Sequence, residues 1–160
     1  ILPHPVDFVP GCGILLMREA LERVGGFDER YFMYWEETDW CCRARREGFS
    51  IWVNPRAQLW HKAPVHPEDL SPLVLYYMAR NRLLFFWEHS QGLRRWQATL
   101  HALHGAVRLA RRYQQADQEA HAQAIWEGIR DFFYRRWGRW EAHSPGPGSG
   151  REALWPASSG

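Results

Sequence analysis

A run of aromatic residues passes directly into three carboxylates in the first third of the chain. Tyr31–Trp35 contains four aromatic side chains, and Glu36, Glu37 and Asp39 follow it. An apolar neighbour disfavours the charged form of a carboxylate and raises its basicity. Acids clustered beside rings therefore cost stability, and such a cluster is expected where a site uses the acids. The stretch therefore predicts the edge of an active site at the start of a helix.

Length, charge and cysteine content limit the class of protein. The chain has 160 residues, enough for one domain or for a piece of a larger one. Its net charge of +2 gives no reason to expect a nucleic acid as partner. The three cysteines include no Cys-x-x-Cys pair, which argues against a disulfide framework or a zinc site and favours a reducing compartment. There is no signal peptide, no apolar run long enough to span a bilayer and no initiating Met, so we expect a fragment of a non-secreted protein.

Glycine and proline divide the first portion of the chain into short elements. Strands are expected at Val6–Val9, Ile14–Met17, Ile51–Val53 and Ala57–Trp60, and helices at Arg18–Val24 and Glu36–Glu47. Gly25 and Gly48 follow the two helices, where glycine supplies a left-handed cap. The order strand, helix, helix, strand predicts an α/β fold in which this portion forms the edge of a sheet.

The second portion is helical. Helices are expected at Leu70–His89, after the break at Ser90–Gly92, and at Ala122–Trp137. In the middle helix, apolar residues spaced three and four apart are expected to bury against the neighbouring helices: Leu93, Trp96, Leu100, Leu103, Val107 and Ala110. The basic, aromatic helices fit two roles equally well, either packing with Arg stems over apolar surface or lying in a membrane interface.

The residue types of the candidate site leave alternatives open. Acids at the start of a helix cap its N-terminus, or one of them acts as a general base toward an acceptor hydroxyl. Adjacent carboxylates cannot flank a glycosidic bond from opposite sides, which argues against a glycosidase. His61, at the end of the last expected strand, is either a core histidine or a ligand for Mg²⁺ or Mn²⁺. Gly11, Cys12 and Gly13 form a tight turn or let an acceptor approach the backbone.

A resemblance narrows these alternatives. The stretch Val24–Phe49, followed by a segment ending in Leu59–Lys62, resembles the C-terminal half of family 2 glycosyltransferases with the GT-A fold, in their rhamnosyltransferase-like and galactofuranosyltransferase-like branch. The similarity covers about Val6–His89, and Tyr76–Arg82 is also similar to that branch. The resemblance implies an α/β fold that forms the C-terminal part of a GT-A domain, followed by helices.

The resemblance also implies residue roles. In this family, the second acid of an aromatic-acid-acid motif is the catalytic base, which falls here on Glu37. Because the family more often has Asp at that position, Asp39 is the reserve candidate. The resemblance places the acceptor beside Gly11, Cys12, Gly13, Trp35 and Glu36, and assigns His61 to the divalent cation, Mg²⁺ or Mn²⁺, that neutralises the donor diphosphate.

The family's N-terminal half, with its nucleotide-binding strands and Asp-x-Asp motif, has no counterpart in this sequence. Residues 1–66 are therefore expected to be the acceptor side of a catalytic domain, 67–141 a helical region and 142–160 a disordered tail. The expected function is inverting transfer of a sugar from a nucleotide-diphosphate sugar to a hydroxyl of a glycan or lipid-linked acceptor. We expect a bacterial, cytoplasmic protein with peripheral contact to the inner face of the membrane, inactive without the missing half. The alternative is a non-catalytic binding or membrane-docking module.

Overall fold

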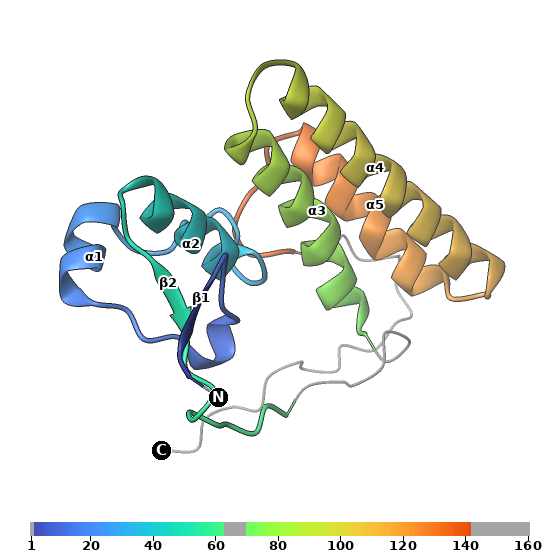
Figure 1. Ribbon diagram of the computed structural model, residues 1–160. Helices are drawn as coiled ribbons and strands as arrows, with labels where there is room; N and C mark the ends of the chain where they lie inside the picture. Colours follow the sequence, from blue (N-terminus) through green and yellow to red (C-terminus); the bar gives the residue numbers. More distant parts are fainter. Residues whose placement is uncertain (1, 63–69, 142–160) are drawn as a thin grey trace.

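The computed structural model describes residues 2–62 and 70–141. Its elements are β1 (His4–Val6), the 3₁₀ helix η1 (Gly11–Gly13), α1 (Arg18–Val24), α2 (Glu36–Arg46), β2 (Ile51–Val53), α3 (Pro72–His89), α4 (Gly92–Gln115) and α5 (Glu119–Phe133). The two strands lie with α1 and α2 in one part, and α3, α4 and α5 form a bundle beside it (Figure 1). The described chain thus combines helices with a small sheet, as expected in coarse terms for α/β, and helices dominate.

The sheet is smaller than the sequence pattern predicts. β1 and β2 pair antiparallel, with Val6 opposite Ile51, so the strand expected at Val6–Val9 is wrong in extent. The segments Ile14–Met17 and Ala57–Trp60 are not strands. The backbone at the two ends of the first segment is extended, but no described strand pairs with it. An apolar pattern predicts extended backbone, whereas a strand also requires a partner.

The first part has its own small core between α1 and α2. Ala20, Trp40, Cys41 and Ala44 are buried there. Helix α1 ends at the predicted glycine, since Gly25 has φ +82° and its N–H donates to the carbonyl of Leu21 at 2.9 Å. The indole of Trp40 donates to the Gly25 carbonyl at 2.8 Å. A left-handed glycine and one indole hydrogen bond therefore fix the loop that leads from α1 toward α2.

The bundle is organised around α3. This helix begins with Ser71 as N-cap, whose hydroxyl accepts a hydrogen bond from the N–H of Val74, and with Pro72 in the first turn. It contributes buried leucines, tyrosines and Ala79 to the bundle core. Helix α5 approaches α3 closely at Gly128, where an added Cβ would lie 2.5 Å from the carbonyl oxygen of Tyr76. Only glycine permits this backbone separation without a shift of the helices.

Helix α4 does not bury the whole apolar stripe expected from its sequence. Leu93, Trp96 and Leu100 are 72%, 56% and 58% exposed, whereas Leu103 and Val107 are half-buried and Ala110 is buried. The first half of α4 instead turns the small residues Thr99 and Ala102 toward its neighbours. The prediction that the stripe is buried is therefore wrong for its first half, because small side chains rather than large ones make the helix contact there.

The other boundaries differ by a few residues. Helix α2 ends at Arg46 rather than Glu47, α3 begins at Pro72 rather than Leu70, and α5 runs from Glu119 to Phe133 rather than from Ala122 to Trp137. The expected domain boundary at 66/67 and the expected tail at 142–160 lie outside the described residues. Among the residues that are described, none of the helices is both long and apolar enough to cross a bilayer.

Candidate functional site

The acids of α2 are positioned by a segment with unusual backbone geometry. Phe32, Tyr34 and Trp35 have φ of +64°, +62° and +75°, in the left-handed region that residues with a Cβ rarely adopt. Trp35 is the N-cap residue of α2. The backbone geometry at Trp35 therefore sets the direction in which α2 begins and in which the side chains of Glu36 and Glu37 project from it. Strained residues of this kind persist only where surrounding structure holds them.

The side-chain amide of Asn81, on α3, holds this segment from behind. Asn81 is fully buried, and its Nδ2 lies 2.9, 2.8 and 2.8 Å from the carbonyl oxygens of Tyr31, Met33 and Tyr34. The two amide hydrogens are thus shared among three backbone acceptors. One side chain of the bundle therefore fixes the path of the chain just before α2.

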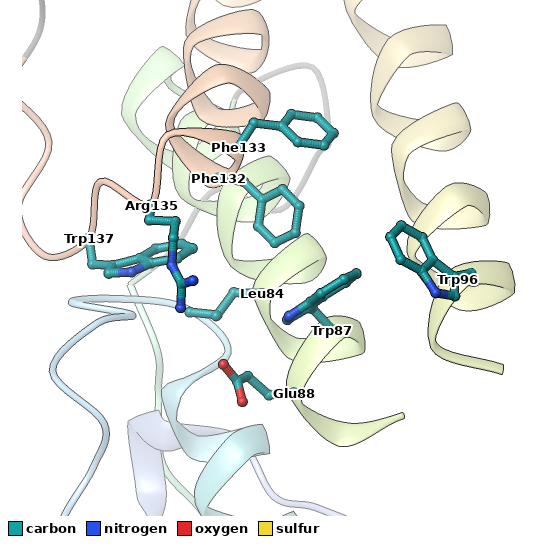
Figure 2. Close-up of a pocket in the computed structure, with 8 residues that line it drawn as sticks. All are labelled: Leu84, Trp87, Glu88, Trp96, Phe132, Phe133, Arg135 and Trp137. Carbon is teal, nitrogen blue, oxygen red and sulfur yellow. The ribbon is translucent and has the colours of Figure 1, made fainter. Parts of the chain in front are cut away.

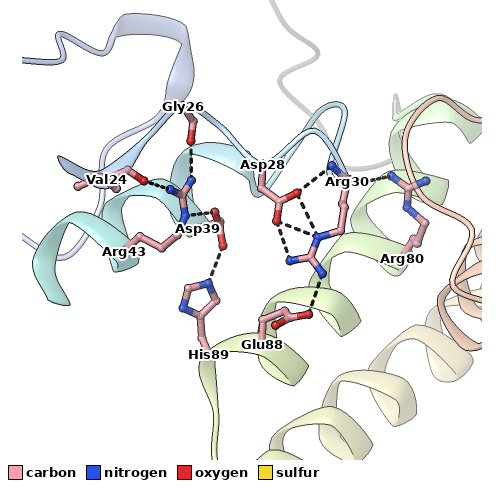
Figure 3. Close-up of polar contacts among 9 residues, drawn as sticks. All are labelled: Val24, Gly26, Asp28, Arg30, Asp39, Arg43, Arg80, Glu88 and His89. Carbon is pink, nitrogen blue, oxygen red and sulfur yellow. Dashed lines mark hydrogen bonds and ion pairs between the residues drawn. The ribbon is translucent and has the colours of Figure 1, made fainter. Parts of the chain in front are cut away.

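The preceding residue, Arg80, extends the same contact. Its buried guanidinium donates to the carbonyls of Arg30, Tyr31 and Gly138 at 3.0, 2.9 and 2.8 Å, and its Nε donates to the Asn81 side-chain oxygen at 2.9 Å. Figure 3 shows Arg80 reaching from the bundle to the backbone of Arg30. We call these two residues the Arg80–Asn81 clamp. Both residues lie in a stretch noted for its resemblance, and no role was predicted for either, although two adjacent polar residues within an apolar helix indicate a buried polar contact.

The carboxylates of Glu36 and Glu37 each have an oxygen that no described residue hydrogen-bonds. Each is partly buried, and the Oε2 atom of each is buried without a hydrogen-bond partner among the described residues. Burial raises the pKa of Glu36 above its ordinary value, and the neighbouring charge of Glu37 raises it further. Unpartnered buried carboxylate oxygens are uncommon in folded proteins and indicate a place for an additional hydrogen-bonding group.

Gly11 lies against these two acids. A Cβ added at Gly11 would be 3.6 Å from Cβ of Glu37 and 3.8 Å from Oε1 of Glu36, so the structure brings this predicted site residue to the carboxylates. A cleft of about 560 Å³ opens beside Glu36, while Glu37 is not among its lining residues; these are Gly11, Phe27, Asp28, Glu29, Phe32, Glu36 and Gly138. Rings and carboxylates thus share one concave surface with the backbone at Gly11.

Asp39 occupies a different environment from the two glutamates. It is 3% exposed and accepts hydrogen bonds from Nε2 of His89 at 2.7 Å and from Nε of Arg43 at 2.8 Å. Arg43 also donates to the carbonyls of Val24 and Gly26, so the pair connects α2 to α3 and to the loop after α1 (Figure 3). Burial alone would raise the pKa of Asp39, but the hydrogen bonds from His89 and Arg43 outweigh it and lower that pKa.

A second ionic contact connects the cleft to α3. Arg30 forms a bidentate pair with Asp28, at 2.7 and 2.9 Å, and its other nitrogen reaches Glu88 at 2.9 Å (Figure 3). These contacts raise the pKa of the Arg30 guanidinium, and the hydrogen bonding that it donates to the Asp28 carboxylate is the main cause. The indole of Trp35 packs on α3, where its ring centroid lies 5.1 Å from that of Phe85. Trp35 does not line the cleft.

The remaining predicted residues lie in a separate hollow. Cys12 and Gly13 line it together with the segment 57–60, and the side chain of Leu59 fills the space that a Cβ at Gly13 would need. His61 follows this segment, is exposed and is not at the end of a strand. Within residues 2–62 and 70–141, no three His, Cys, Asp or Glu side chains gather to hold a metal ion. His61 therefore lacks, in the described structure, the partners that a Mg²⁺ or Mn²⁺ site requires.

Comparison with curated proteins finds glycosyltransferases. The chain is 35% identical over 109 residues to an N-acetylglucosaminyl-diphospho-decaprenol L-rhamnosyltransferase of Mycobacterium tuberculosis, an alignment that covers 66% of this chain and 34% of the relative. It is 35% identical over 81 residues to a low-salt glycan biosynthesis hexosyltransferase of Haloferax volcanii, covering 50% of this chain and 26% of the relative. A dTDP-rhamnosyl transferase of Shigella flexneri is 27% identical over 94 residues, covering 51% and 30%.

These alignments are partial. The chain spans 26% to 34% of the length of the curated relatives it matches. No protein-family model matches the sequence. No solved structure matches it either. Over the aligned residues, the comparisons confirm that the chain resembles rhamnosyltransferase-like glycosyltransferases.

Proposed function

We propose that this chain forms the acceptor side of an inverting GT-A glycosyltransferase. The enzyme would transfer a rhamnosyl or related hexosyl group from a nucleotide-diphosphate sugar to a hydroxyl of a lipid-linked glycan. The observation that carries the proposal is the pair Glu36 and Glu37: their side chains lie against Gly11, and the Oε2 atom of each is buried without a hydrogen-bond partner among the described residues. The relatives are named for rhamnosyl and hexosyl transfer, and one is named for a decaprenol-linked acceptor.

Glu37 is the proposed general base. As the acceptor oxygen attacks the anomeric carbon, the bond from that carbon to the diphosphate breaks, the diphosphate leaves with the electron pair, and Glu37 takes the hydroxyl proton. Attack from the face opposite the leaving group inverts the anomeric centre. The hydrogen bonds favour Glu37 over Asp39, because both oxygens of Asp39 already accept hydrogen bonds from Arg43 and His89, whereas Oε2 of Glu37 has no partner among the described residues.

The cleft beside Glu36 is the proposed acceptor site. Phe27 and Phe32 offer ring faces, and the carboxylates of Glu29 and Glu36 offer hydrogen-bond acceptors to sugar hydroxyls. In this arrangement Glu36 positions the acceptor while the neighbouring Glu37 removes the proton. Cys12 and Gly13, which line the separate hollow, and Trp35, which packs on α3, remain proposed contributors to acceptor binding outside this cleft.

A divalent cation and a nucleotide-binding half complete the proposal. Mg²⁺ or Mn²⁺ would supply positive charge to the departing diphosphate, with His61 as one ligand. Because the described residues do not gather a full ligand set around His61, no step is assigned to the cation. We place the enzyme in the cytoplasm at the inner face of the membrane, where a lipid-linked acceptor is accessible.

The test is Glu37→Gln in the complete protein that carries this chain. Transfer of rhamnose from dTDP-rhamnose to N-acetylglucosaminyl-diphospho-polyprenol is measured. Turnover should fall at least about 100-fold, the lower range for a general base, while donor binding stays nearly unchanged. Glu22→Gln, the same charge change at an exposed residue of α1, is the matched control and should retain turnover.

Two outcomes would contradict this assignment. Wild-type turnover in Glu37→Gln would remove Glu37 from the chemistry. If Asp39→Asn then lost turnover while keeping its circular dichroism spectrum, the base would be Asp39 instead. Absence of transfer by the wild-type protein from any dTDP-, UDP- or GDP-sugar would reject the proposed reaction itself.

A further inference from the structure

Helix α4 carries a concentrated positive charge. Its 24 residues include five arginines and no Asp or Glu. The rest of the chain has fifteen Lys and Arg against eighteen Asp and Glu, so the small net charge of the chain conceals one basic helix and an acidic remainder. Arg94, Arg108, Arg111 and Arg112 are exposed, and none forms an ion pair with an acid among the described residues. This charge is available to an external anionic partner.

Large apolar side chains lie exposed on the same helix. Leu93, Trp96 and Leu100, more than half exposed, follow one another at spacings of three and four, so they share one side of α4. Arg111, about three turns after Leu100, continues that side, and Arg108 lies at its edge, about 80° further round the helix. An exposed Leu and Trp stripe that runs into arginines is the pattern of helices that lie in a lipid interface.

An apolar pocket adjoins the start of this stripe. Figure 2 shows Trp87 of α3 and Trp96 of α4 on one side of it and Phe132 and Phe133, at the end of α5, on the other. The pocket has a volume of about 250 Å³ and includes Arg135. Phe133 is itself 60% exposed, so the apolar surface continues from α4 across the pocket to α5. Exposed apolar surface of this extent and shape marks a contact site rather than scattered surface residues.

We propose that the face formed by α4, the pocket and the end of α5 docks on an anionic lipid surface. Leu93, Trp96, Leu100 and Phe133 would enter the interface between headgroups and acyl chains, and the arginines of α4 would contact lipid phosphates. A second copy of the chain fits this face poorly, because a symmetric contact would bring two acid-free, arginine-rich helices together. The inference does not depend on the proposed sugar transfer.

Vesicle co-sedimentation of the purified chain tests the apolar part of the face. The chain should bind vesicles of phosphatidylglycerol and phosphatidylcholine at least about tenfold more tightly than vesicles of phosphatidylcholine alone, and added salt should weaken that binding. The double variant Leu93→Ser, Leu100→Ser should lose at least about tenfold of it. The matched control is Leu2→Ser, Leu15→Ser, at residues that are 82% and 94% exposed in the other part of the chain, and it should bind like the wild type.

A second pair of variants tests the charge. Arg108→Gln, Arg111→Gln should weaken binding to the anionic vesicles, whereas Arg18→Gln, Arg56→Gln, at exposed arginines outside α4, should have a much smaller effect. All four variants change exposed side chains, and each should keep the wild-type circular dichroism spectrum.

Three results would overturn the proposal. Equal sedimentation with neutral and anionic vesicles would exclude recognition of lipid charge. An equal loss in the Leu2, Leu15 control would show that any exposed leucine suffices. A dimer in sedimentation equilibrium that Leu93→Ser, Leu100→Ser converts to monomer, together with no vesicle binding, would assign the face to a second copy.

Discussion

Replacing Asn81 with alanine removes the amide that holds the segment before α2. Nδ2 of Asn81 contacts three backbone carbonyls, and its side-chain oxygen accepts a hydrogen bond from Arg80. All of these groups lie at or near a fully buried side chain, so water cannot replace the amide without entering the core. The three left-handed residues next to these carbonyls would also lose the contact that holds them in that conformation.

The expected loss of stability follows from these contacts. Each ordinary hydrogen bond contributes about 0.5–1.5 kcal/mol, and a buried group left without its partner costs about 1–3 kcal/mol. Alanine gains only about 0.5 kcal/mol in helix propensity over asparagine. We therefore expect Asn81→Ala to lower the free energy of unfolding by about 3–5 kcal/mol, a large part of the roughly 5–15 kcal/mol that a domain has.

Urea unfolding followed by circular dichroism at 222 nm measures this loss. Hydrogen exchange read by mass spectrometry should show faster exchange over residues 30–36, since those backbone groups lose their anchor. The matched control is Asn54→Ala, because Asn54 is exposed and its side chain accepts one local hydrogen bond, from the N–H of Arg56. That change should cost less than about 1 kcal/mol.

An Asn81→Ala protein within about 0.5 kcal/mol of wild type would show that these hydrogen bonds do not stabilise the fold. A destabilised protein in which exchange at residues 30–36 is no faster than elsewhere would show that the loss comes from the bundle alone and not from the clamp.

Two further predictions concern ionisable residues. Because hydrogen bonds from His89 and Arg43 lower the pKa of Asp39 in the folded state, its stabilising contribution is present above the unfolded value near pH 4 and is lost as pH falls through the folded pKa. Asp39→Asn should therefore be less stable than wild type at pH 7, by about 1.5–3 kcal/mol, and the difference in urea midpoints should shrink below about pH 4; a constant difference from pH 7 to pH 3 would contradict this. His61→Ala in the complete protein should raise the Mn²⁺ or Mg²⁺ concentration needed for half-maximal transfer, since a lost ligand loosens metal binding, and an unchanged metal titration would leave His61 without that role.

Helices were predictable from the sequence where the signal is local. The bounds of α1 match the prediction because Gly25 ends it and its apolar residues keep a helical spacing. The strands were not predictable in this way. Ile14–Met17 has the composition of a strand and extended backbone at its two ends, but no described strand pairs with it. The packed face of α4 was also mispredicted, because the pattern favours Leu93 and Trp96 while the helix contact uses Thr99 and Ala102.

In the candidate site, too, the features that depend on local sequence were predictable, and those that depend on contacts between distant residues were not. The sequence placed Glu36 and Glu37 in the first turn of α2, and the structure adds Gly11 beside them. The clamp could not be derived from spacing, because Arg80 and Asn81 lie about 50 residues from the carbonyls they hold, a separation that only the fold closes. The distinct surroundings of Asp39 depend equally on His89, which is 50 positions away.

The hydrogen bonds from the clamp to the segment before α2 all go to main-chain carbonyls. A backbone carbonyl is the same in every residue type, so the hydrogen bonds from Arg80 and Asn81 do not themselves select the side chains at positions 32 and 34; the left-handed φ of these residues does. Phe32, whose ring lines the cleft, and Tyr34 are both exposed on the outer side of this segment. Substitutions at these two positions that the left-handed backbone tolerates therefore leave the hydrogen bonds of the clamp in place, so the surface of the cleft can change while the two glutamates keep their orientation.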